Sequence, residues 1–188
     1  SDTQLNAAPV TTFAGTLTGL GHTISNLTIE ALNTDNVGLI GTNTGTIRDL
    51  GLVGGSVTGQ SNVGGLVGWN KGTISNAYAT GTVTGNYYVG GLVGNVGGTK
   101  TSYSTINNAY ATGTVTGEQY IGGLAGNSNI YSTISNVYAT GAVTGHTYFG
   151  GLVGTNKGTI SNAYAAGAVT GGNYLGGLVG DNYQGTIN

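Results

Sequence analysis

The chain of 188 residues contains no cysteine, no methionine, one proline, four lysines and arginines, and six aspartates and glutamates. Without cysteine it can form neither a disulfide nor a thiolate metal site. Four basic side chains neutralise too few phosphates for electrostatic binding of nucleic acid. The apolar runs are short and interrupted by glycine, so none is long enough to cross a membrane as a helix. These absences exclude nucleic acid as a partner and predict no membrane insertion.

Glycine, tyrosine and small polar residues dominate what is present, with 39 glycines and 12 tyrosines. The hydrophobic fraction of 38% is too high, and the net charge of −2 too small, for a disordered chain. The glycines do not follow the three-residue period of collagen. The composition therefore predicts a folded protein, and its low lysine content with abundant threonine, asparagine and glycine indicates a secreted or cell-surface location.

A block of the type Gly-Leu-Val-Gly recurs along the chain, at intervals of 26–32 residues. Each copy is followed by a Thr-Ile pair, and most copies then continue with a stretch such as Ala77–Gly85. Self-similarity with a period of 20–50 residues is typical of solenoids, propellers and other repeat arrays. The copies of the block are at 38–41, 65–68, 91–94, 123–126, 151–154 and 177–180.

Each repeat contains three short stretches of β-type pattern. Apolar side chains flank a polar-tolerant position at Ala77 and Ala79, and Val83 and Val89 centre two further stretches. This alternation is typical of half-buried strands, and no segment shows helical spacing. The sequence predicts an all-β fold, a parallel β-solenoid (β-helix) of about six coils of 26–32 residues with three short strands each. A propeller is disfavoured, because its blades usually need about 40 residues or more.

The repeat pattern also predicts the domain organisation. Residues 1–12 do not match the repeat and are interpreted as an N-terminal cap or linker, whereas residues 13–188 form the solenoid and end in the middle of a repeat. Residues 95–105 are longer than the equivalent 69–73, so extra loops are expected at one corner of the rod. An open solenoid end exposes unpaired strand edges, which makes head-to-tail self-association a possible mode of assembly.

Aligning the repeats places small polar side chains in one file. We expect these side chains to hydrogen-bond to one another and to turn backbone, as a structural row. Asp49 occupies the same position in one repeat. The asparagines of the row are Asn26, Asn76, Asn108, Asn136 and Asn162.

Two files of tyrosines are predicted on the outer surface. They could stabilise the stack through aromatic pairs between coils, each contributing roughly 0.2–1 kcal/mol. They could also form a strip that binds a glycan or a protein, because exposed aromatic rings offer rigid faces with a polar tip. One file is Tyr78, Tyr110, Tyr138 and Tyr164, and the other is Tyr88, Tyr120, Tyr148 and Tyr174.

Catalysis needs titratable groups, and this chain has few. Glu30 and Asp49 lie in neighbouring repeats at positions about 13 Å apart along an extended strand, farther than the roughly 5 to 9.5 Å between glycosidase carboxylates. His22 and His146 belong to distant repeats, so neither a two-histidine metal site nor a catalytic triad is expected. We therefore predict no enzyme activity, no catalytic residues, no cofactor and no metal.

The recurring blocks resemble the GLUG-motif repeats of bacterial surface proteins. The resemblance rests on Val63–Gly68, Gly72–Asn76 and Tyr78–Gly81 and on their recurrence, and Gly15–Ile29 is similar to the coil that often precedes such arrays. GLUG repeats occur in adhesins like filamentous haemagglutinin and in non-catalytic parts of immunoglobulin A peptidases. The resemblance implies a secreted or surface-exposed protein with an adhesive or stalk role, and it carries over no catalytic residue.

The predicted function is that of a structural and adhesive segment, a rigid stalk or display rod that contacts a host or neighbouring-cell surface through a glycan or protein. Two alternatives stay open: a carbohydrate-binding module that uses the tyrosine files, and a filament subunit that assembles head to tail. Outward threonines also suggest an ice-binding face, but alanines interrupt the array. These are Ala142, Ala166 and Ala168.

Overall fold

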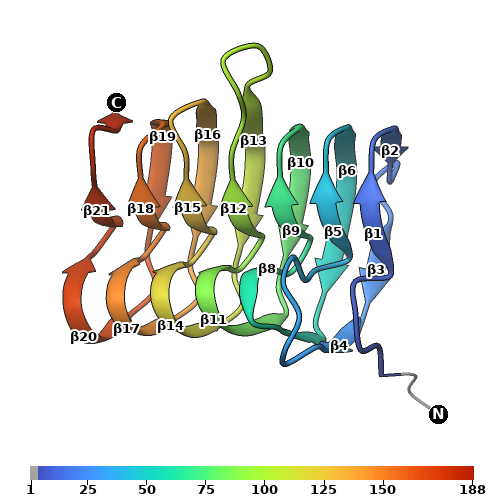
Figure 1. The fold of residues 1–188 in the computed structure, drawn as a ribbon, viewed down its shortest axis with the longest axis horizontal. Coiled ribbons are helices and arrows are strands. Elements are labelled where there is room, and N and C mark those ends of the chain that lie inside the picture. The colour runs from blue at the N-terminus through green and yellow to red at the C-terminus, as the bar shows by residue number, and fades with distance from the viewer. Residues whose placement is uncertain (1–3) are drawn as a thin grey trace.

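The structure, a computed structural model, describes residues 4–188 and consists of strands stacked side by side along one axis (Figure 1). No helix occurs among these residues, and therefore none that could cross a membrane. All pairs between the named strands are parallel, and they form three sheets that run the length of the rod. The predicted all-β parallel solenoid of about six coils is confirmed.

Each coil contributes to the three sheets in turn. The first sheet contains β1 (Val10–Phe13), β5 (Ile40–Asn43), β9 (Val67–Asn70), β12 (Val93–Val96), β15 (Ala125–Ser128), β18 (Val153–Asn156) and β21 (Val179–Asn182). The second contains β2 (Thr16–Thr18), β6 (Thr46–Val53), β10 (Thr73–Ala79), β13 (Ser104–Ala111), β16 (Ser132–Ala139), β19 (Thr159–Ala165) and β22 (Thr186–Ile187), with β3 (Thr23–Ser25) also on β6. The third contains β4 (Thr28–Glu30), β7 (Ser56–Thr58), β11 (Thr82–Gly90), β14 (Val115–Gly122), β17 (Val143–Gly150) and β20 (Val169–Gly176), with β8 (Ser61–Gly64) on β11.

Equivalent residues of successive repeats are strand partners. Ile74 pairs with Ile47 on one side and with Ile106 on the other, and Val83 pairs with Val115. Each repeat therefore advances the rod by one strand spacing, about 4.8 Å. This register stacks like side chains on like, as the repeat predicts.

Two clusters of apolar side chains fill the interior. The larger cluster contains the isoleucines of the second sheet and the leucines of the repeated block, such as Ile74 and Leu92, which are fully buried. The smaller cluster lies beneath the third sheet and contains Val83, Val89 and Phe149. A single coil could not bury these side chains, so the core exists only because coils are stacked.

One glycine file marks a corner where successive coils touch. A Cβ atom on Gly113 would lie 1.8 Å from the carbonyl oxygen of Gly81, and one on Gly141 would lie 1.9 Å from that of Gly113. Both distances are far below van der Waals contact. The repeat therefore requires glycine at this position because the backbones leave no room for a side chain.

The N-terminal boundary differs from the expected one. Leu5 forms a parallel bridge with Ile29, and β1 pairs with β5, so the boundary expected after residue 12 falls inside a solenoid strand. The ladder between β1 and β5 is made of backbone groups, which do not depend on the side chains, so β1 joins the sheet without matching the repeat. The part of the proposed cap formed by residues 1–3 lies outside the described residues.

The longest insertion protrudes from one corner. The segment between β12 and β13 leaves the stack as a loop at the top of Figure 1, closed by an antiparallel bridge between Thr99 and Ser102. Nearby, the Tyr103 and Tyr131 rings meet edge to face at 5.9 Å.

Candidate binding surface

The eight tyrosines of the two predicted files form two continuous ladders. In the 78 ladder (Tyr78, Tyr110, Tyr138 and Tyr164) successive ring centroids are 4.8, 4.7 and 5.1 Å apart. In the 88 ladder (Tyr88, Tyr120, Tyr148 and Tyr174) the distances are 4.9, 5.3 and 4.6 Å. The rings are nearly parallel throughout, because consecutive strands hold them one rung apart.

Stacking limits what the ladders show to solvent. Tyr164 and Tyr174 have exposed fractions of 55% and 63%, whereas the other six ladder tyrosines are half-buried. Within a ladder each ring face is covered by the next ring, so ring edges and hydroxyl groups form the surface. The expectation of broadly exposed aromatic faces is therefore wrong for six of the eight residues.

The backbone distinguishes the two ladders. Tyr88, Tyr120, Tyr148 and Tyr174 have φ of 53°, 61°, 57° and 57°, whereas no residue of the 78 ladder has a positive φ. The left-handed region is unusual for a bulky residue and costs roughly 1–2 kcal/mol per residue. The 88 ladder is therefore held in a strained conformation along four consecutive coils.

The same corner position is occupied by asparagine in the earlier coils. Asn36 and Asn62 precede Val37 and Val63, which align with Val89, and their φ values are 57° and 51°. Asparagine suits this conformation because its short side chain can hydrogen-bond locally. The corner thus accepts the less strained residue in two coils and carries tyrosine in the next four.

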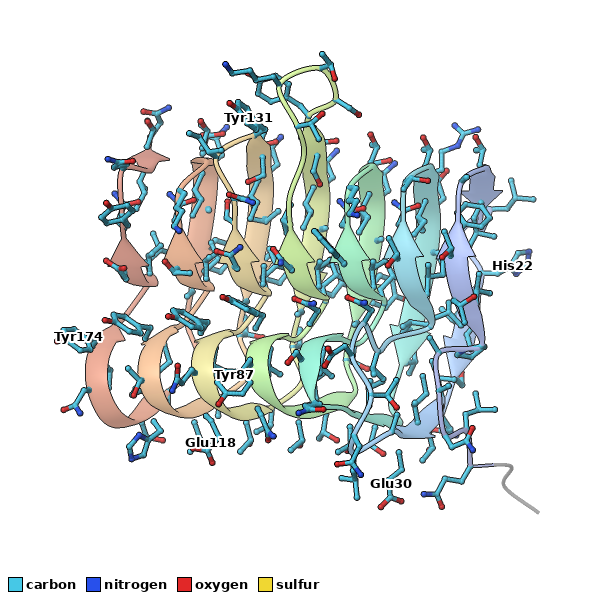
Figure 2. All side chains as sticks on the ribbon, viewed as in Figure 1. His22, Glu30, Tyr87, Glu118, Tyr131 and Tyr174 are labelled. Carbon is cyan, nitrogen blue, oxygen red and sulfur yellow. The ribbon has the colours of Figure 1, made fainter. Side chains whose placement is uncertain are left out.

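A groove of about 470 Å³ runs beside the 88 ladder, and we call it the 88 groove. One wall is formed by Tyr88, Tyr120 and Tyr148, and the other by Asn95, Asn127 and Thr155 of the first sheet, with Lys157, Asp181 and Tyr183 at the end nearest β21. Tyr174, which continues this ladder on β20, projects at the left edge of the rod in Figure 2. The lining is mostly polar and carries one charged group of each sign.

A chain of side-chain hydrogen bonds runs from Asn36 and Asn62 of the earlier coils to Asn95 and Asn127 of the groove wall. Asn62 donates from Nδ2 to Oδ1 of Asn36 at 3.0 Å, Asn95 donates to Asn62 at 3.3 Å, and Asn127 donates to Asn95 at 2.8 Å. Each such bond uses one of the two amide protons of its donor. Of the two amides that line the groove, Asn95 is half-buried and keeps one amide proton for a ligand, whereas Asn127 is buried.

The environment of the ladders affects two phenols. Burial in the stack, followed by the neighbouring Tyr138 and Tyr78, raises the pKa of Tyr110. Desolvation, followed by Tyr174, Tyr120 and the Asp181 carboxylate, raises the pKa of Tyr148. Both phenols are therefore neutral, and able to donate a hydrogen bond, over the whole physiological pH range.

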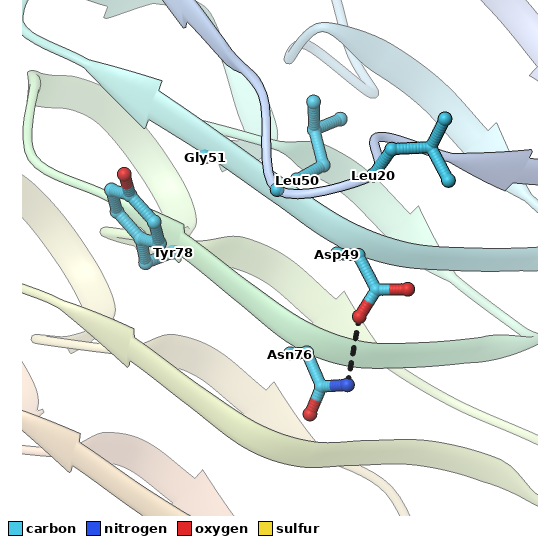
Figure 3. A pocket seen from close by; sticks show the side chains of 7 residues that line it. Leu20, Asp49, Leu50, Gly51, Asn76 and Tyr78 are labelled. Atoms are coloured by element: carbon cyan, nitrogen blue, oxygen red, sulfur yellow. Dashed lines mark hydrogen bonds between the residues drawn. The ribbon is translucent and has the colours of Figure 1, made fainter.

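A hollow of about 400 Å³ lies where the 78 ladder stops at Gly51 (Figure 3). The ring of Tyr78 leans over Gly51, so that a Cβ atom there would lie 2.3 Å from Cζ of Tyr78. Leu20 forms another side of the hollow, and Asp49 accepts a hydrogen bond from Nδ2 of Asn76 at 2.9 Å.

Side-chain hydrogen bonds link the polar file of the second sheet in two separate runs, Asp49 to Asn108 and Asn136 to Asn162. Beyond the Asn76–Asp49 pair, Asn108 donates to Asn76 at 3.3 Å and Asn162 donates to Asn136 at 3.2 Å. All five of these residues have φ between 48° and 55°. The file therefore marks a bend within each strand of the second sheet.

Asn26 does not belong to this file, and its assignment is corrected. The amide N–H groups of Gly19 and Gly21 donate to the carbonyls of Arg48 and Asp49, so Leu20 takes the position beside Asp49. Asn26 lies further along, where its own N–H donates to Val53. The first coil makes an extra turn between β2 and β3, which shifts the residues that follow out of the repeat alignment.

A second set of asparagines, which the sequence analysis did not single out, is buried at the corner between the first and second sheets. Asn43 donates to Oδ1 of Asn70 at 2.7 Å, and Asn70 donates to Oγ of Ser104 at 2.9 Å. Asn156 binds both the N–H and the carbonyl of Gly158. The available signal for this corner was the Asn-x-Gly that recurs ahead of three Thr-Ile pairs, at 43–45, 70–72 and 156–158.

The outward threonines are more regular than expected in one file and interrupted in the next. Thr58, Thr84, Thr116, Thr144 and Thr170 are successive strand partners in the third sheet. Two residues earlier on each strand, Thr82 and Thr114 give way to Ala142 and Ala168. The two-file threonine array is thus complete only in the middle coils.

Several titratable groups outside the ladders are engaged in separate local contacts. Gln4 donates to Oε2 of Glu30, and Asp49 is bound by Asn76. Arg48 donates to Oγ1 of Thr18 at 3.0 Å instead of pairing with Asp49. Among the described residues, no group of three or more histidines and carboxylates is placed to hold a metal ion.

Comparison with known proteins identifies the repeat. The family described as "The GLUG motif" matches residues 59–84, 85–116 and 117–144. Halomucin of the archaeon Haloquadratum walsbyi (strain DSM 16790 / HBSQ001) is 46% identical over 71 residues, which are 37% of this chain and 1% of Halomucin. The chain thus covers only a small part of Halomucin. No solved structure matches this chain.

The matched segments coincide with coils whose equivalent residues are strand partners, so the sequence motif and the structural coil are the same unit. Residues 59–144 therefore carry three consecutive GLUG repeats, as the recurring Gly-Leu-Val-Gly block predicted.

Proposed function

We propose that the chain is a rigid, non-catalytic repeat segment of a cell-surface protein, which extends or displays other parts of that protein. The observation that carries this proposal is the unbroken stacking of coils. Three parallel sheets, two apolar clusters and two tyrosine ladders continue from coil to coil. A rod of this kind resists bending because every coil is bonded along three sheets to its neighbours. The GLUG repeats and the similarity to Halomucin support a surface location.

The rod is tested by lengthening it. Duplicating residues 85–144, which the GLUG family matches as two repeats, should add two coils and extend the maximum dimension by about 10 Å, at roughly 4.8 Å per coil. Small-angle X-ray scattering should show this extension with an unchanged cross-section. An unchanged length with a thicker particle would contradict the proposal.

The surface location is tested on intact cells of the source organism. The loop at residues 97–103 protrudes from the rod (Figure 1), so antibodies raised against it should label cells without permeabilisation. Labelling only after the cells are opened would contradict a surface role.

An adhesive role is the second part of the proposal, and the 88 groove is the observation that favours it. This groove combines a strained aromatic ladder with a facing wall of amide and hydroxyl side chains, of which Asn127 and Thr155 are buried. Beads coated with the chain should adhere to a surface that carries the ligand, and substitution within the groove should abolish this adhesion. Head-to-tail association and the choice of host surface stay predictions.

A further inference from the structure

We propose that the 88 groove binds a linear, uncharged glycan that lies along the rod axis. This inference rests on the adhesive part of the proposed function and names its site and its ligand class. The argument uses the spacing of the groove, the groups that line it and the strain in one of its walls.

The groove repeats its lining at every rung. Successive tyrosine rings of the 88 ladder are 4.6–5.3 Å apart, and on the opposite wall Asn95, Asn127 and Thr155 are strand partners. The advance per sugar of an extended β-linked hexopyranose chain is close to one such rung. Each sugar of a bound chain therefore lies beside one rung of each wall, and because successive sugars of a β-1,4-linked chain are turned over, they present alternate edges to a given wall.

The chemistry of the walls fits hydroxyl groups. Phenol and amide groups both donate and accept hydrogen bonds, as sugar hydroxyls do. The tyrosine faces are covered by stacking, so a flat aromatic ligand finds no free face within the ladder. Lys157 and Asp181 are the charged residues of the lining, and their charges are opposite, which favours an uncharged ligand.

The strained backbone indicates that these tyrosines have a role beyond stacking. The 78 ladder has the same ring spacing without a positive φ, and Asn36 and Asn62 show that asparagine satisfies the 88 position in earlier coils. Strained conformations of this kind cluster at functional sites. The retained strain lies in the same ladder that forms a wall of the groove.

The test is a titration of the full chain with cello-oligosaccharides of two to six glucose units, with binding measured by isothermal titration calorimetry. Affinity should rise with length up to three units, one per ladder tyrosine that lines the groove, and then level off. Removing one groove hydroxyl with Tyr120→Phe should weaken binding of the six-unit probe by about two- to tenfold, the usual contribution of one hydrogen bond. The matched control Tyr138→Phe, in the 78 ladder, should leave binding unchanged. Malto-oligosaccharides, whose chains curve, should bind more weakly than cello-oligosaccharides of equal length.

Three results would overturn the inference: absence of binding to the six-unit probe at millimolar concentration, equal losses in the two tyrosine variants, or equal binding of the two oligosaccharide series. Small-angle scattering of the chain with duplicated coils, measured beside the glycan titration, separates the rod proposal from the glycan proposal. A chain that lengthens as expected on coil duplication and still binds no glycan retains the rod function and refutes the glycan site.

Discussion

Substituting tyrosine by asparagine should affect the two ladders differently, although their stacking is alike. Tyr120 stacks on its neighbours at 4.9 and 5.3 Å, and Tyr138 stacks on its own at 4.7 and 5.1 Å. Each variant loses two aromatic pairs, at roughly 0.2–1 kcal/mol per pair. Tyr120→Asn also relieves the left-handed strain of about 1–2 kcal/mol, since asparagine accepts a φ near 61°.

The two terms nearly cancel for Tyr120 and do not cancel for Tyr138. We expect Tyr138→Asn to lower the free energy of unfolding by about 0.4–2 kcal/mol, the loss of two aromatic pairs, and Tyr120→Asn to be less destabilising than Tyr138→Asn by about 1–2 kcal/mol, the strain that it relieves. Equilibrium urea unfolding followed by circular dichroism measures both values.

The difference between the two variants is the quantity that reports strain, because the lost stacking is common to both. A difference near zero, with both variants equally destabilised, would show that the 88 ladder is not strained. That result would also remove the backbone argument for a functional role of these tyrosines.

Three further outcomes follow from the same structure. Asn70→Ala should lower the free energy of unfolding by about 1–3 kcal/mol, because it removes a buried amide and leaves its partners unpaired, whereas the exposed Asn86→Ala, at a position without positive φ, should change it by less than about 0.5 kcal/mol; equal effects in urea unfolding would contradict the buried corner. The raised pKa values of Tyr110 and Tyr148 mean that the fold favours the neutral phenols, so stability should be fully present below the usual pKa of 10.0 and fall as the pH rises through the raised values. Thermal melts between pH 8 and 12 should show this decline, it should diminish in a chain with both residues changed to phenylalanine, and an unchanged decline would contradict the assignment. The chain should show no thermal hysteresis in a nanolitre osmometer, because alanines interrupt one of its two threonine files, and measurable hysteresis would reinstate the ice-binding alternative.

The architecture was predictable because repetition fixes it. A repeat of constant pattern can bury its apolar face only against copies of itself. The alignment of Ile74 with Ile106 in the sequence therefore predicted that the two residues are strand partners. The same logic placed the tyrosines in files. Since stacking covers the ring faces, however, the exposure of a single tyrosine could not be read from its outward position.

The errors and omissions lie where the chain leaves the regular pattern. Asn26 was misplaced because the extra turn between β2 and β3 shifts the first coil against the others. The role of Asn70 was missed because inward and outward positions stop alternating at a corner. The strain at Tyr120 has no signal in the tyrosine itself, but the equivalent Asn36 and Asn62 are residues that favour a positive φ, and they could have revealed it.

The most direct test of one repeat per coil uses the absence of natural cysteine. Thr84 and Thr116 are strand partners in β11 and β14, which places their Cα atoms about 4.8 Å apart, within the range that a disulfide can bridge. The double variant Thr84→Cys with Thr116→Cys should form an intramolecular disulfide under mild oxidation, and Thr84→Cys with Thr144→Cys, two rungs apart, should not. Failure of the first pair, or equal cross-linking of the second, would contradict the stacked solenoid.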